Sequence, residues 1–140
     1  MIRSITQSDL PALKQVIDAN NLFPGEMLDE MTSHYFSAAP HNEIWLTFDK
    51  SGPAALAYCA PERMTSGTQN LLLIAVHPAQ QGQGIGSKIV KFLEEKLATS
   101  GNRLLLVETS SLPEFDATRQ FYTKRGFHLE ARIHDFYNAG

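Results

Sequence analysis

The stretch that decides the fold runs from His77 to Lys88 and reads HPAQQGQGIGSK. It places Gly82, Gly84 and Gly86 between an apolar run and an amphipathic run. Glycine in the first turn of a helix costs up to about 1 kcal/mol relative to alanine. Amides at a helix start lack intrahelical partners and lie at the positive end of the helix dipole, so such a turn can bind phosphate. We interpret the stretch as a phosphate-binding turn; the plainer alternative is a strand–helix turn that merely uses glycine.

Two familiar phosphate-binding motifs do not fit these glycines. Counted from Gly82, the Walker motif requires a second glycine at the position that Ser87 occupies. The dinucleotide-binding fingerprint requires a third glycine at that same position, and its glycines directly follow a strand. Here residues 77–81 intervene. The stretch therefore predicts a different class of phosphate ligand.

Length and composition describe an ordinary globular chain. Its 140 residues fit one domain, and a formal net charge of −3 gives no broad basic surface for nucleic acid. The single cysteine, Cys59, allows no intramolecular disulfide and is expected to be a small core residue. The N-terminus is too polar for a signal peptide, and no apolar run approaches the roughly 18 residues of a membrane span. We expect a cytoplasmic protein without a metal site.

Hydrophobic periodicity predicts strands and helices on both sides of the glycine stretch. The run Leu71–Val76 is apolar on both faces, which favours a central, buried strand. Strand, helix and strand across the glycines predict a parallel pair, whereas the preceding strands favour an antiparallel meander. The fold class is therefore α/β, with a mixed central sheet and helices on both faces. Strands are expected over 2–5, 43–48, 54–60, 70–76, 104–107 and 127–136, and helices over 10–19, 24–35, 85–97 and 115–125.

Two motifs resemble those of one enzyme superfamily. The pattern Gln-x-x-Gly-x-Gly is present as Gln81–Gly86, after a strand that ends Ala-Val-His-Pro, and it resembles the acyl-CoA-binding motif of the GNAT N-acyltransferases. The stretch Phe121–Phe127, FYTKRGF, is similar to the Tyr-x-x-x-Gly-Phe motif that closes the GNAT domain. The predicted order of elements also matches. We identify residues 1–140 as a single GNAT-like acetyltransferase domain.

The resemblance implies a cofactor site for acetyl-CoA. The amides of the glycine turn would hold the diphosphate, and the strand before it would pair with the pantetheine arm. The amide of Val76 would stabilise the oxyanion formed from the thioester. Tyr122 matches the general acid that protonates the leaving thiolate, although it could simply pack against the cofactor. The implied cofactor-binding residues are Ile74, Ala75, Val76, Gln81, Gly82, Gln83, Gly84, Ile85, Gly86 and Ser87.

Three departures from the family pattern affect the catalytic prediction. The family often has a glutamate in the central strand, but residues 70–76 hold no carboxylate. Glu108, expected at the end of the next strand, is the best remaining general base; turn amides could instead bind it. Weaker candidates are Glu43, Glu62 and His77, and a water chain without a single base is a further alternative.

The second departure is at Phe115, where many relatives carry asparagine. The family usually has one more strand after the segment that matches 132–137, and we expect this strand to be missing because the sequence stops at Gly140. Truncation, a shortened natural form or a homodimer that completes the sheet would each explain this.

The resemblance implies transfer of an acetyl group from acetyl-CoA to a primary amine, by direct attack in a ternary complex. A non-catalytic acyl-CoA-binding or regulatory module is the alternative, and a structural protein with an empty cleft is a third. The acceptor stays open among protein lysine, a polyamine, an aminoglycoside and a small amino compound. The segment 18–40 forms the acceptor wall in the family. Its Asp18, Glu26, Asp29 and Glu30 could attract a cationic amine.

Overall fold

The computed structural model describes residues 1–108 and 115–128. The chain falls into two compact units, Met1–Glu108 and Thr109–Gly140. No helix among the described residues is both long and apolar enough to cross a membrane.

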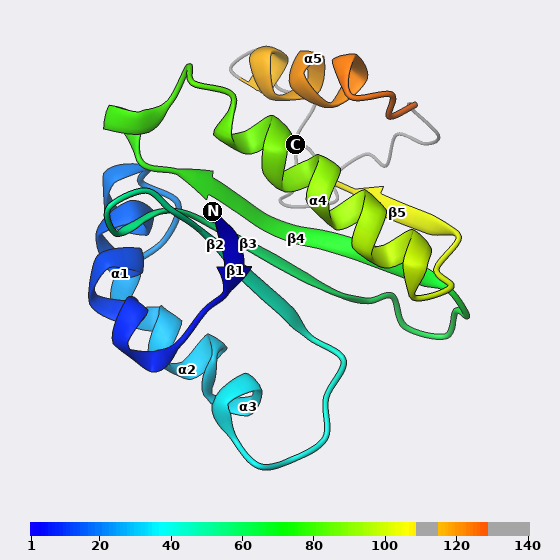
Figure 1. Cartoon of the computed structure of the whole chain (residues 1–140), viewed down its shortest axis with the longest axis horizontal. Coiled ribbons are helices and arrows are strands. Elements are labelled where there is room, and N and C mark those ends of the chain that lie inside the picture. Colours follow the sequence, from blue (N-terminus) through cyan, green and yellow to red (C-terminus); the bar gives the residue numbers. More distant parts are fainter. Residues whose placement is uncertain (109–114, 129–140) are drawn as a thin grey trace, which may run out of the picture. The chain divides into compact units, whose positions relative to one another are not determined.

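A five-stranded mixed sheet forms the centre of the first unit, in the spatial order β1-β2-β3-β4-β5 (Figure 1). The first four strands pair antiparallel, and β4 pairs with β5 in parallel. This confirms the predicted combination of a meander and a parallel pair. The strands are β1 (Ile2–Ser4), β2 (Ile44–Asp49), β3 (Pro53–Pro61), β4 (Thr68–Val76) and β5 (Leu104–Val107).

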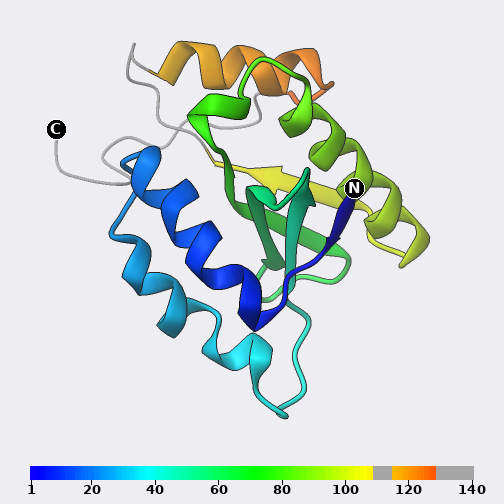
Figure 2. The same cartoon turned by 60° about the vertical axis from the view of Figure 1, so that its left-hand side comes forward.

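Helices cover both faces of this sheet, as predicted (Figure 2). Helix α1 (Leu10–Ala19) packs its apolar side, including Leu13 and Ile17, against Trp45 and Leu56. Helix α4 (Ile85–Thr99) covers the opposite face. It buries Ile85, Ile89, Val90, Leu93 and Leu97, which share one helical side.

The predicted helix over 24–35 is instead three short pieces. These are η2 (Gly25–Met27), α2 (Leu28–Met31) and α3 (Ser33–Phe36). Thr32 lies between α2 and α3, and its hydroxyl donates to the Leu28 carbonyl at 2.7 Å. Such a bond competes with the helical ladder and bends a helix. Local polar chemistry therefore interrupts an otherwise regular apolar stripe.

A bulge in β4 changes which side chains face each helix layer. Tyr58 of β3 pairs with Leu73, and the next residue, Cys59, pairs with Leu71, so Leu72 has no partner in β3. One extra residue reverses the alternation of side chains beyond it. Leu72 is 53% exposed, so the expectation of a strand buried along its whole length is wrong at this residue.

Strand β4 is paired on its β5 side only along its first half. The last pair in that register is Leu71 with Val107. Among the described strands, the half of β4 that follows the bulge therefore has an open edge where β5 diverges. The glycine stretch begins at the end of this half.

The second unit contains helix α5 (Asp116–Lys124), close to the predicted 115–125. Of the predicted strand 127–136, residues 127 and 128 are not in a strand, and 129–136 lie outside the described residues. The expected loss of a further strand also lies outside them.

Candidate active site

The glycine stretch joins β4 to α4 through η3 (Pro78–Gln80) and a tight turn. Gly82 and Gly84 have φ of +80° and +79°, which glycine adopts without the Cβ penalty of other residues. A Cβ at either position would meet nothing within 4 Å, so conformation rather than space requires glycine. Within α4, Lys88 N–H donates to the Gly84 carbonyl at 3.1 Å. The amides of Ile85 and Gly86 precede this first intrahelical bond, an arrangement that favours an anion.

The side chain of Gln81 anchors the turn to the rest of the first unit. Its Nε2 donates to the Val76 carbonyl at 3.0 Å and to Asn20 Oδ1 at 3.2 Å. Asn20 Nδ2 also donates to the Val76 carbonyl, at 3.0 Å, and to the Val16 carbonyl at the end of α1. Two amide side chains therefore hold the end of β4 against α1. Asn20 was not predicted from the sequence, because its role depends on the packing of α1 beside β4.

The open edge of β4 presents the backbone of Ile74 and Val76. The N–H of His77 donates to the Ala54 carbonyl of the neighbouring chain segment at 2.9 Å. Because backbone groups of successive strand residues point to opposite sides, the Val76 and Ile74 amides face away from β3, and Ala75 faces it. Of the three predicted strand residues, the structure thus directs the backbones of Ile74 and Val76 to the open edge.

Two lysines lie beside the glycine turn. Lys50, between β2 and β3, donates from Nζ to Gln83 Oε1 and, at 3.5 Å, to Gln80 Oε1. The Nζ of Lys88 lies 5.8 Å from the centre of the Phe48 ring. These two cations add positive charge next to the amides of the helix start. Lys50 is remote in the sequence, so only the β2–β3 pairing could reveal it.

Glu108 lies where β4 and β5 part, because it follows Val107, the last paired residue of β5. Its Oε1 accepts a hydrogen bond from Asn70 Nδ2 at 3.3 Å. The same Nδ2 donates to Glu62 Oε2 at 2.9 Å. Glu62 and Glu108, both sequence candidates for the general base, are therefore brought together by Asn70, which the sequence analysis did not single out.

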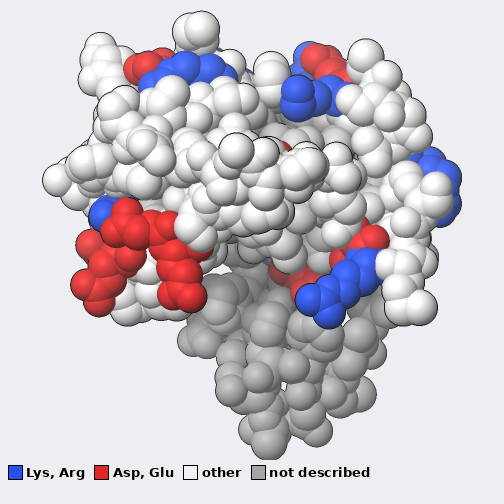
Figure 3. All heavy atoms as spheres, turned by 90° about the horizontal axis from the view of Figure 1, so that it is seen from below, with Lys and Arg blue, Asp and Glu red and all other residues white. Residues whose placement is uncertain are grey.

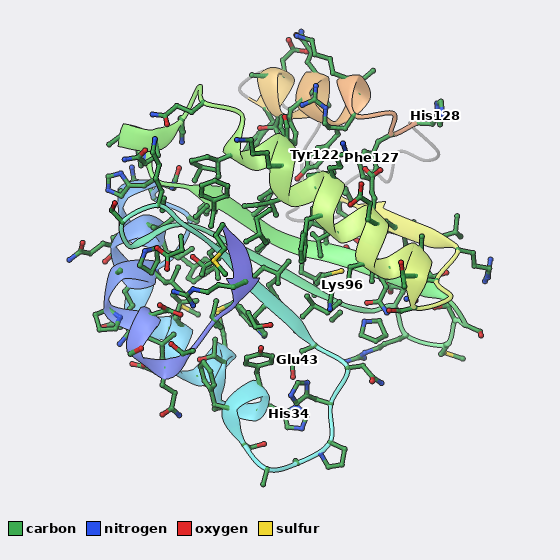
Figure 4. The ribbon with its side chains drawn as sticks, viewed as in Figure 1. His34, Glu43, Lys96, Tyr122, Phe127 and His128 are labelled. Carbon is green, nitrogen blue, oxygen red and sulfur yellow. The ribbon has the colours of Figure 1, made fainter. Side chains whose placement is uncertain are left out.

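The two other candidate bases have structural partners. Glu43 accepts from Trp45 Nε1 at 3.1 Å and pairs with His34 Nδ1 at 2.9 Å (Figure 4). Burial alone would raise the pKa of Glu43, but these hydrogen bonds hold it below its ordinary value. His77 Nδ1 accepts from the Ala79 amide at 3.1 Å and so caps η3. Neither side chain is positioned by these contacts to act as a base.

Acidic residues of the predicted acceptor wall are partly engaged in the fold. Asp18 Oδ1 accepts from the Gly25 amide at 2.7 Å, and Asp29 pairs with Lys14 at 2.7 Å. On the face shown in Figure 3, acidic side chains gather in one larger group and basic ones in small separate groups. These contacts give two of the four acidic residues a structural role.

Tyr122 is held within its own unit by the end of α5. Gly126, with φ of +93°, lets Phe127 N–H donate to the Tyr122 carbonyl at 3.1 Å and Gly126 N–H donate to the Thr123 carbonyl. This left-handed helix cap brings the Phe127 ring to 5.5 Å from the Tyr122 ring, edge to face (Figure 4). The Tyr-x-x-x-Gly-Phe spacing is therefore that of a helix cap. Burial raises the pKa of Tyr122 to about 12, so its phenol stays protonated at neutral pH.

Comparison with protein families matches residues 40–129 to the acetyltransferase (GNAT) domain. The chain belongs to this family. The GNAT superfamily resemblance and the predicted GNAT fold are both confirmed. A search of curated proteins found no match.

Solved structures are similar to this chain over nearly its whole length, beyond the residues that the family model matches. A GNAT-family protein from Desulfovibrio desulfuricans is 27% identical, with a TM-score of 0.88 over 100% of this chain and 92% of that one. The ribosomal-protein-S18-alanine N-acetyltransferase from Escherichia coli is 25% identical, with a TM-score of 0.74 over 98% and 83%. A Brucella melitensis GNAT acetyltransferase solved with acetyl-CoA is 22% identical, with a TM-score of 0.63 over 86% and 80%, and shares the fold.

Proposed function

We propose that residues 1–140 form one GNAT domain that transfers an acetyl group from acetyl-CoA to a primary amine. The observation that carries this proposal is the glycine turn at the start of α4, directly after the open edge of β4. The acetyl-CoA found with the Brucella protein and the alanine acceptor named for the Escherichia coli protein support it.

The cofactor would lie along β4 with its diphosphate at the turn. Amides from Gln81 to Ser87 would hold the diphosphate, and the ammonium group of Lys50, which donates to Gln83 in the turn, would add positive charge, as would Lys88 in the first turn of α4. The pantetheine amides would pair with the open edge of β4 at Ile74 and Val76, with Ala75 between them. Diphosphate and an extended arm thus match the anion site at the turn and the open strand edge that directly precedes it in the chain.

The reaction begins with an ammonium, because an aliphatic amine has a pKa of about 10.4 and its deprotonation at pH 7 costs about 4–5 kcal/mol. Glu108, directly or through water, would accept that proton. The nitrogen lone pair would then attack the thioester carbonyl, and an N–H at the open edge of β4, that of Ile74 or Val76, would stabilise the resulting oxyanion. Collapse breaks the carbon–sulfur bond, and Tyr122 would protonate the departing thiolate. The second nitrogen proton, released as the neutral amide forms, would return to Tyr122 through water.

Thiol release from acetyl-CoA tests this function with a panel of primary amines. We expect amine-dependent release of CoA thiol by the native chain. Tyr122→Phe should lower kcat by about 10²–10⁴-fold, the range for a general acid, while acetyl-CoA affinity stays within about threefold. Glu108→Gln should lower kcat and shift the acid limb of the pH profile. Binding of acetyl-CoA without release for any amine would contradict the enzyme and support a non-catalytic acyl-CoA-binding module.

A further inference from the structure

The side chain of Asn70 leaves one polar atom without a partner. Asn70 is 4% exposed, and within the described residues its Oδ1 has no hydrogen bond. Its Nδ2 donates to Glu62 at 2.9 Å and to Glu108 at 3.3 Å, which fixes the orientation of the amide. Burying a carbonyl oxygen without a hydrogen-bond donor costs free energy. A bound ligand that donates a hydrogen bond to Asn70 Oδ1 would remove this cost.

The charges around Asn70 call for a cationic donor. Two carboxylates share one neutral amide nitrogen, and within residues 1–108 no Lys or Arg forms an ion pair with either of them. Like charges at such separation repel each other, and a cation would relieve that repulsion. An ammonium group carries three N–H donors, which match two carboxylates and one carbonyl oxygen.

Apolar side chains continue from these oxygens along β5. Asn70 is paired with Leu106, and Thr68 with Leu104, so both leucines lie on the Asn70 face of the sheet. Leu106 is 37% exposed and Leu104 is 50% exposed. Strands β4 and β5 run side by side here (Figure 1). An apolar stem bound through its ammonium end would therefore find an apolar strip beside the charged group.

We propose that Glu62, Glu108 and Asn70 Oδ1 form the seat of the acceptor's ammonium group, and that the acceptor is a primary alkylammonium with an apolar stem over Leu104 and Leu106. The inference rests on the proposed acetyl transfer and names its substrate class. In this arrangement Glu62 is a specificity-determining residue that holds the ammonium. Glu108 faces the same group and is placed to take its proton.

Binding to the free protein tests the seat without any turnover. The side-chain amide resonances of Asn70 are followed while n-hexylammonium, and separately n-hexanol, is titrated into the full chain. We expect a saturable shift with the ammonium and little with the alcohol. Glu62→Gln, which keeps an oxygen for Asn70, should weaken ammonium binding about 10-fold or more, as expected for a lost hydrogen bond to a charged group. Glu94→Gln, on the exposed side of α4, is the matched control and should bind normally.

Kinetics then separate the roles of the two carboxylates. With n-hexylamine as acceptor, Glu62→Gln should raise KM about 10-fold and change kcat less than about threefold, whereas Glu108→Gln should mainly lower kcat. An unchanged KM in a folded Glu62→Gln variant, equal binding of hexanol, or saturable binding of Ca²⁺ in place of the ammonium would overturn the seat. If the chain bound no acetyl-CoA, the proposed acetyl transfer would be wrong. The titration with n-hexylammonium would still show whether Glu62, Glu108 and Asn70 bind an ammonium group.

Discussion

Gly84 combines a structural and a ligand-binding role at one residue. Its φ of +79° begins α4, and Gly101 has a φ of +83° just beyond the other end of the same helix. Alanine at either position should cost about 1–2 kcal/mol of unfolding free energy, because both Cβ atoms would enter open space at a left-handed φ. Urea unfolding should show similar losses for the two variants. Only Gly84→Ala should also weaken acetyl-CoA binding. Equal acetyl-CoA affinities in the two variants would contradict a phosphate-binding role for the glycine turn.

Gly25 is required for a different reason, which the sequence analysis did not find. Its φ is unremarkable, but a Cβ there would lie 2.5 Å from the Lys14 carbonyl oxygen of α1 and 3.0 Å from the Asp18 carboxylate oxygens. Gly25→Ala should therefore cost about 1–3 kcal/mol, the range for overpacking against backbone. Thermal unfolding with Glu26→Ala as control would check this, since the side chain of Glu26 is exposed in the same short helix. A stable Gly25→Ala would contradict the packing of η2 on α1.

At the scale of elements, Arg3 joins β1 to two other segments. Its guanidinium donates to both carboxylate oxygens of Asp9, at 2.8 and 2.9 Å, and to Asp49 at the end of β2. The Arg3 hydrogen bonds outweigh burial and lower the pKa of Asp9 from 3.8 to about 2. A depressed folded-state pKa stabilises the protein above the unfolded value.

This clamp predicts a loss of stability in acid. The contribution of Asp9 is fully present above about pH 4 and should disappear as the pH falls toward 2, a loss of about 1–2 kcal/mol. Unfolding free energies measured between pH 5 and 2 should fall less steeply in Asp9→Asn than in the native chain. Parallel curves for the two proteins would show that Asp9 is not clamped.

Elements with a strong local signal could be predicted, and elements that depend on pairing could not. The periodic stripe of α4 and its terminal glycines predicted its bounds closely, because capping and amphipathicity are local properties. The bulge at Leu72 and the break at Thr32 escaped prediction, since one depends on the β3 register and the other on a single hydroxyl bond. The glycine turn could be predicted for the same reason, because its signal is also local. The contact of Asn70 with Glu62 and Glu108 could not be predicted, because β3, β4 and β5 must pair before these residues meet.

At the scale of the whole molecule, Cys59 reports on global opening. It is 0% exposed, and burial raises the pKa of its thiol to about 11. Both properties suppress the reactive thiolate. Reaction with a disulfide reagent at pH 8 should therefore be at least about 10³-fold slower than for an unfolded thiol, and its rate should rise with urea in step with unfolding.

An exposed cysteine is the control that shows whether slow reaction comes from burial of the thiol or from the reagent. Glu95→Cys, on the exposed side of α4 in a Cys59→Ala background, should react rapidly without urea. Fast reaction of native Cys59 would contradict a core that closes over β3.

The account as a whole rests on an acyl-CoA site at the glycine turn, and calorimetric titration with acetyl-CoA, CoA and NADH tests it most directly. We predict saturable binding of one acetyl-CoA per chain, binding of CoA, and no heat of binding with NADH. Binding of NADH, or the absence of binding by acetyl-CoA to the folded chain, would contradict the central claim and leave the glycines as a structural turn.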